Sequence, residues 1–187
     1  MNKRLVDKLT LWLKRKHPGT VFKMRDFFME YVARLFGIVP LSASLGARVF
    51  RVGGSVEDLG IVSVHMVTDA FVNYLVDSLQ GVEADWDDFK YHDSGTGTNV
   101  EAVGNTALQT PTGEARDVGT QIEGATANIY KSVATHTYAG SFAITEHALL
   151  NAAAAGTLMD RSVFTAINVI SGDRIEFTYQ LSVTSGG

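Results

Sequence analysis

The segment RIEFTYQLSVT, residues 174–184, decides the fold of this chain. Its apolar side chains stand at every second position, with polar side chains between them. Successive side chains of a strand point to opposite faces, so this alternation predicts a strand with one buried and one solvated face. The side chains expected on the buried face are Ile175, Phe177, Tyr179, Leu181 and Val183.

The residues before this strand favour antiparallel pairing. Gly172 and Asp173 have turn chemistry, so residues 162–169 are expected to form a hairpin with the last strand. Residues 128–138 and 141–150 predict a second hairpin around Gly140. From Phe89 onward, short strands separated by Gly, Asn, Asp and Ser are typical of a mainly β protein with an antiparallel β-sandwich, jelly-roll-like in its finer form.

The preceding residues divide into a linker and the start of the β domain. Residues 37–60 are rich in Gly and Ser and are interpreted as a linker, so the β domain is expected to span residues 61–187. Residues 61–68 predict a strand. Residues 69–80 predict one short helix, with Thr68 as its cap and Gly81 as its stop. The positions expected to be buried on that helix are Val72, Leu75, Val76 and Leu79.

Residues 1–36, called the basic arm below, have the spacing of two amphipathic helices separated by Pro18. A helical hairpin this short cannot bury its own aromatic side chains. The arm is therefore expected to pack on the β domain or on a neighbouring subunit, and the second option favours a homo-oligomer. The side chains expected to make this contact are Leu5, Leu9, Trp12, Phe28, Tyr31 and Leu35.

Charge separates the arm from the rest of the chain. The arm holds nine Lys/Arg and three Asp/Glu, a balance of +6, whereas residues 37–187 hold seven and seventeen, a balance of −10. A basic arm on an acidic body indicates a polyanion, an anionic lipid surface or an acidic patch on another copy as its partner; a solvated helix face is the alternative. Nucleic-acid binding by the arm is one of these open possibilities.

Composition excludes some chemistry. The chain has no Cys, so it has no disulfide, thiolate zinc site or thiol nucleophile. No run of about 18 apolar residues and no secretory signal is present, so we expect a protein that does not enter a membrane.

Several short motifs raise the question of an enzyme. Asp93-Ser94-Gly95 matches one loop of an aspartic protease, but only one copy occurs, whereas such proteases need two carboxylates. Adjacent residues His92, Asp93 and Ser94 point to alternating faces and cannot form a hydrolase triad.

Binding motifs are equally incomplete. The run Gly95-Thr96-Gly97-Thr98 lacks the spacing and the Lys of a phosphate-binding loop, so a tight turn is expected there. The five His show no metal-ligand spacing, and residues 83–88 are acidic without the order of a calcium loop. The sequence therefore predicts no enzyme, no cofactor and no metal site.

Taken in order, a set of short motifs resembles a β module of tailed-bacteriophage virion structural proteins. It comprises Tyr91-His92, Gly95-Thr96-Gly97-Thr98, Asn105-Thr106-Ala107-Leu108, Arg116, Gly119-Thr120, Ile144-Thr145-Glu146-His147, Gly156-Thr157-Leu158, Asp160-Arg161, Phe164 and Gly172-Asp173. The resemblance covers about residues 89–187 and leaves the basic arm outside. In physical terms, Glu146 and Arg161 are expected to form a partly buried ion pair that fixes strand register.

The resemblance implies a component of a phage particle, assembled in the host cytoplasm and found in the virion. We favour a capsid-associated protein of the cement or decoration type, whose arm and β domain tie neighbouring shell subunits together, with the major capsid protein as its main partner. Repeated weak contacts of this kind need no catalytic residues. A tail-fibre, baseplate or other tail component is the alternative, and a nucleic-acid-binding arm on a structural domain is the second alternative.

Overall fold

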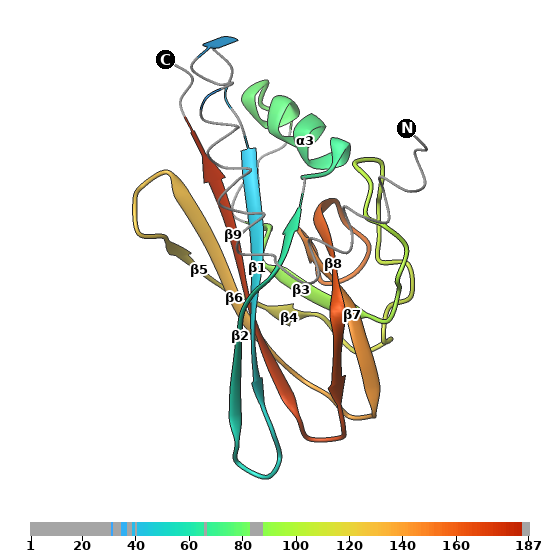
Figure 1. The fold of residues 1–187 in the computed structure, drawn as a ribbon. Helices are drawn as coiled ribbons and strands as arrows, with labels where there is room; N and C mark the ends of the chain where they lie inside the picture. The colour runs from blue at the N-terminus through green and yellow to red at the C-terminus, as the bar shows by residue number, and fades with distance from the viewer. Residues whose placement is uncertain are drawn as a thin grey trace, which may run out of the picture.

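The computed structural model describes residues 31, 35, 36, 39, 41–65, 67–82 and 88–184. Within these residues the chain forms two antiparallel sheets and a helix over Asp69–Leu79 (Figure 1). Sheet A has the strand order β2-β1-β9-β6-β5, and sheet B has the order β4-β3-β7-β8. The elements are β1 (Leu41–Phe50), β2 (Val56–His65), α3 (Asp69–Leu79), β3 (Tyr91–Gly95), β4 (Asp117–Val118), β5 (Thr120–Glu123), β6 (Ile129–Thr137), β7 (Phe142–Leu150), β8 (Leu158–Val169) and β9 (Arg174–Val183).

The last strand, β9, is the centre of sheet A. It pairs with β1 on one side and with β6 on the other. Ile175, Phe177, Tyr179 and Leu181 are buried as their alternation predicts, whereas Val183 at the strand end is 38% exposed. These side chains share one hydrophobic core with residues of sheet B such as Phe164. The prediction of a mainly β, antiparallel fold is thus confirmed.

The prediction of a linker over residues 37–60 is wrong for residues 41–60. They form β1, the β1–β2 turn and half of β2, so sheet A begins at Leu41, twenty residues before the predicted domain start. β1 does alternate, with apolar Leu41, Ala43, Leu45, Ala47 and Val49 at every second position, but the Ser and Gly residues between them give the segment the composition of a linker. Gly54 and Gly60 have positive φ, which glycine adopts at low cost, in the turn and in the irregular part of β2.

Both predicted hairpins are also wrong, although all four of their strands exist. β8 pairs with β7 in sheet B, whereas β9 and β6 pair with each other in sheet A. The turns at Gly140 and Gly172 therefore carry the chain from one sheet to the other. They are hydrogen-bonded together, because the Gly172 amide donates to the Tyr138 carbonyl and the Tyr138 amide donates to the Asp173 carbonyl.

The Asp173 carboxylate holds this corner together. It accepts hydrogen bonds from the amides of Val52 and Ile170 and pairs with Arg51 at 3.0 Å. The Val52 hydrogen bond above all, supported by Arg51, lowers the pKa of Asp173 below its ordinary value. Turn residues here join the β1–β2 turn to the β8–β9 turn.

The predicted helix is confirmed, but its predicted buried face is wrong. The Thr68 hydroxyl accepts a hydrogen bond from the Phe71 amide, as expected of the cap. Phe71 and Tyr74 are the buried side chains of α3, whereas Val72, Val76 and Leu79 are 40%, 44% and 76% exposed. Of the four positions expected to be buried, only Leu75 packs against the core. None of the helices in the described part of the chain is long and apolar enough to span a bilayer.

Candidate functional site

Glu146 and Arg161 form a buried ion pair between β7 and β8, as the sequence predicts. The Arg161 Nε atom lies 2.7 Å from the Glu146 carboxylate, and the two side chains are 2% and 0% exposed. Glu146 pairs in register with Val163. A charge buried to this degree is stable only when its hydrogen-bonding capacity is met.

Backbone amides from a distant loop meet that requirement for Glu146. The amides of Gly97, Gln109 and Thr110 donate to the Glu146 carboxylate at 3.0, 3.0 and 2.7 Å. A Cβ atom on Gly95 or Gly97 would lie 2.5 Å from Glu146 Oε1. The glycines therefore make room for this carboxylate, and loop amides that could have bound an external anion are occupied by a side chain of the same protein.

Arg161 extends these contacts to the rest of the loop. Its Nη1 atom donates to the Asn99 carbonyl and to Asn105 Oδ1, at 3.3 and 3.4 Å, and the same Asn105 oxygen accepts from the Ala102 amide. Leu108 packs against Ala148, Leu150 and Leu158 and so anchors the loop by an apolar contact. We call Glu146, Arg161 and the loop 95–110 the Glu146 network.

Asp93 and Arg116 form a second pair at the edge of sheet B. Their side chains lie 3.1 Å apart, and Arg116 Nη1 also donates to the carbonyls of Ala152 and Ala155 at 2.7 Å each. The Asp93 carboxylate, considered above as a protease residue, accepts in addition from the Ser94 amide. Asp93 thus holds Arg116, whose hydrogen bonds to Ala152 and Ala155 fix the β7–β8 loop.

Sequence reasoning missed a chain of buried polar groups that joins the two sheets. His92 Nε2 lies 2.8 Å from Ser132 Oγ, and His92 Nδ1 lies 2.9 Å from His147 Nε2. The order hydroxyl, imidazole, orienting group is that of a nucleophilic triad. However, Ser132, His92 and His147 are 0%, 2% and 1% exposed, so no substrate reaches the hydroxyl. Burial lowers the pKa of His92 to about 3, and the ring is neutral at pH 7.

A third cluster joins β4 to β6. His136 lies between two carboxylates, with Nε2 2.7 Å from Glu114 and Nδ1 hydrogen-bonded to Asp117. Burial lowers the pKa of His136, but the hydrogen bonds to Asp117 and Glu114 outweigh burial, so the pKa is raised above its usual value. Glu114 also accepts from the Ala139 amide and so holds the β6–β7 corner.

Candidate metal ligands do not gather in the described ranges. Within them, no group of three or more His, Asp or Glu side chains is placed to hold a metal ion. Of the acidic segment 83–88, only Asp88 is described, and it pairs with Lys90 at 3.0 Å.

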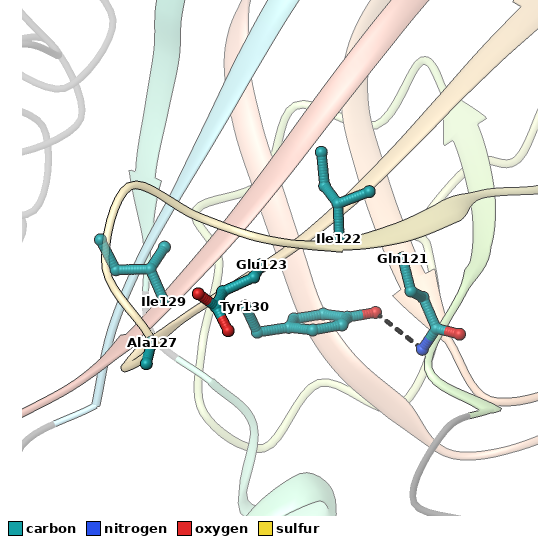
Figure 2. Close-up of a pocket in the computed structure, with 6 residues that line it drawn as sticks. All are labelled: Gln121, Ile122, Glu123, Ala127, Ile129 and Tyr130. Carbon is teal, nitrogen blue, oxygen red and sulfur yellow. Dashed lines mark hydrogen bonds between the residues drawn. The ribbon is translucent and has the colours of Figure 1, made fainter.

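An open hollow of about 350 Å³ lies along the β5–β6 hairpin. Figure 2 shows Tyr130 reaching toward Gln121, whose amide donates to the Tyr130 hydroxyl at 3.2 Å. That hydroxyl in turn donates to the Phe89 carbonyl at 2.6 Å, so it is committed to the fold. The remaining lining residues are Ile122, Glu123, Ala127 and Ile129.

Among the residues expected to form the assembly contact, Tyr31 and Leu35 are described. Both are helical, and each is 62% exposed. Phe36 is helical and Val39 is not, and these two are 68% and 61% exposed. Leu5, Leu9, Trp12 and Phe28 lie outside the described residues.

No protein-family model, curated protein or solved structure matches this chain. The resemblance to phage virion proteins therefore stays a prediction.

Proposed function

We propose that this chain is a structural component of a tailed-phage particle, a capsid-associated protein of the cement or decoration type. One contrast carries the proposal. The polar clusters described above are bonded internally, and the Glu146–Arg161 pair and the Ser132, His92 and His147 side chains are buried. Large apolar side chains, in contrast, are exposed on α3 and at the end of the arm. Buried, satisfied polar groups specify a fold, and gathered apolar groups on a surface indicate protein contacts.

The motifs behind the resemblance support the same proposal. Gly95, Gly97, Asn105, Glu146 and Arg161 belong to the Glu146 network, so a large part of the motif set describes one structural unit. Such a unit makes the domain rigid and does not require the domain to catalyse a reaction. The jelly-roll likeness and the helical form of the whole arm remain parts of the proposal.

Gold labelling of a C-terminal tag on purified particles, imaged by negative stain, tests the placement. We expect label over the head surface, because a cement protein binds at many symmetry-related positions. Label confined to the tail would overturn the capsid assignment and favour the tail component, for which the open hollow of Figure 2 offers a binding surface. Absence of label from both would overturn the virion role.

The nucleic-acid alternative is tested separately by filter binding of the full chain to duplex DNA across a salt series. Phosphate contacts by the basic arm would give an affinity that falls steeply with salt. We expect little binding at physiological ionic strength, since the arm is proposed to contact protein.

A further inference from the structure

We propose that the exposed apolar face of α3 binds the basic arm of a second copy of this chain. The inference rests on the proposed assembly function and names the surface that receives the arm.

The position of α3 on the domain is fixed. The Thr68 amide donates to the Met159 carbonyl of β8, and the Asp69 amide donates to the Val103 carbonyl, both at 2.9 Å. Phe71 and Tyr74 pack edge-on against Phe89, with ring centroids 5.1 and 5.0 Å apart. The helix cannot rotate to bury another face without breaking these contacts.

The side of this anchored helix that adjoins its buried face is apolar and exposed. Val72, Val76 and Leu79 follow the spacing i, i+4, i+7, which places them in one stripe. They are 40%, 44% and 76% exposed, and Val82 just beyond the helix is 68% exposed. We call Val72, Val76 and Leu79 the α3 face. Apolar side chains gathered in this way, rather than scattered singly, mark a contact surface.

Charge identifies a partner for the α3 face. Residues 69–88, which include the helix and the segment after it, hold six Asp/Glu and no Lys or Arg, a balance of −6. The basic arm has the opposite balance, +6, and an apolar stripe at helical spacing. An apolar face with acidic surroundings therefore matches an apolar stripe with basic surroundings, as helix-in-groove recognition requires.

The exposure of both surfaces indicates that the arm bound to the α3 face belongs to another molecule. Tyr31 and Leu35 belong to the stripe of the arm, and each remains 62% exposed within its own chain. The α3 face is exposed in the same chain, so the α3 face and the described part of the arm's stripe are both open on one protomer. Each copy can then offer an arm and accept one, which closes a symmetric dimer or a ring.

Figure 1 shows that the geometry suits such an exchange. α3 lies at the end of the molecule where β1 begins and β9 ends. The arm precedes β1 in the sequence, so the chain passes from the arm into the domain at the end that carries α3.

Sedimentation velocity on the full chain tests the proposal. We expect the wild type to associate, with a dissociation constant that rises with salt. The receptor variant Val76→Asp/Leu79→Asp and the arm variant Tyr31→Asp/Leu35→Asp should each weaken association at least tenfold. The control Val56→Asp/Val118→Asp adds the same charge at side chains that are 57% and 64% exposed on β2 and β4, and it should associate like the wild type.

Mixing the receptor variant with the arm variant separates exchange between chains from packing within one chain. The mixture contains intact arms and intact α3 faces on different molecules, so we expect mixed complexes although neither variant associates alone. A monomeric wild type, or a receptor variant that associates as well as the control, would overturn the proposal. If gold label is absent from particles, the virion role is overturned, but the proposed contact between the arm and the α3 face is not.

Discussion

The interior around Glu146 and the α3 face differ in opposite directions from the usual distribution of side chains: the first buries charged groups and the second exposes apolar ones. Inside, a carboxylate and a guanidinium are buried to 0% and 2% exposure, and loop amides donate hydrogen bonds to the carboxylate. Outside, Leu79 is 76% exposed with further apolar side chains beside it. The difference separates two tasks: buried charges specify which loop closes over sheet B, and exposed apolar groups remain for another molecule.

The largest expected effect comes from breaking the buried pair. Glu146→Gln leaves Arg161 as an uncompensated buried charge, so we expect the free energy of unfolding to fall by about 3–5 kcal/mol. Urea unfolding monitored by circular dichroism measures it. Glu176→Gln is the matched control, because Glu176 pairs with Arg48 at 3.3 Å with side chains 28% and 44% exposed. That change should cost less than about 1 kcal/mol, and equal losses would refute the structural role of the network.

A smaller loss is expected from crowding the same carboxylate. In Gly97→Ala the new methyl group would lie 2.5 Å from Glu146 Oε1 and 2.7 Å from the Cβ of Gln109. We expect about 1–3 kcal/mol of destabilisation in the same unfolding assay. Gly104→Ala, in the same loop with no atom within 4 Å of the added group, should be close to neutral. If both substitutions are neutral, the loop does not close over Glu146 as described.

Acid should weaken the chain of buried groups around His92. The pKa of His92 in the folded state, about 3, lies below the ordinary 6.5. In acid the unfolded chain therefore binds a proton at this imidazole that the folded chain does not bind. Stability from this group is complete above the unfolded pKa and falls as pH drops from 6.5 toward 3, by about 1 kcal/mol between pH 6 and pH 5. The unfolding free energy of His92→Gln should fall less over this interval. An equal decline in both proteins would contradict a neutral, buried His92.

The smallest effect on stability is expected at the α3 face. Val76→Asp/Leu79→Asp changes side chains that are 44% and 76% exposed, so the unfolding free energy of the monomer should change by less than about 1 kcal/mol. Unfolding at concentrations below association measures it. A loss as large as that of Glu146→Gln would show that this face supports the fold rather than assembly.

The sequence predicts the secondary-structure elements better than it predicts which strands pair. The alternation in residues 174–184 identifies β9, and the cap at Thr68 identifies α3, because both signals are local. Gly140 and Gly172 have turn chemistry that serves a hairpin and a crossing between sheets equally well. Strand pairing depends on contacts distant in sequence, and both hairpin predictions fail for that reason.

The same limit applies to the candidate site. The ion pair of Glu146 and Arg161 is expected from the sequence, but the loop amides that complete it come from 36–49 residues away. His92 and Ser132 are 40 residues apart and meet only when the sheets pack. On α3, Phe71 and Tyr74 are buried in place of the valine stripe, because larger aromatic side chains fill the space beside Phe89.

Hydrogen–deuterium exchange of the unmodified chain, measured at low and at high protein concentration, tests the separation of fold and assembly most directly. We predict that amides of α3 and of the basic arm exchange more slowly at high concentration, while those of β7 and β8 are unchanged. Exchange in α3 that does not depend on concentration, or protection that increases equally in β7 and β8, would contradict it.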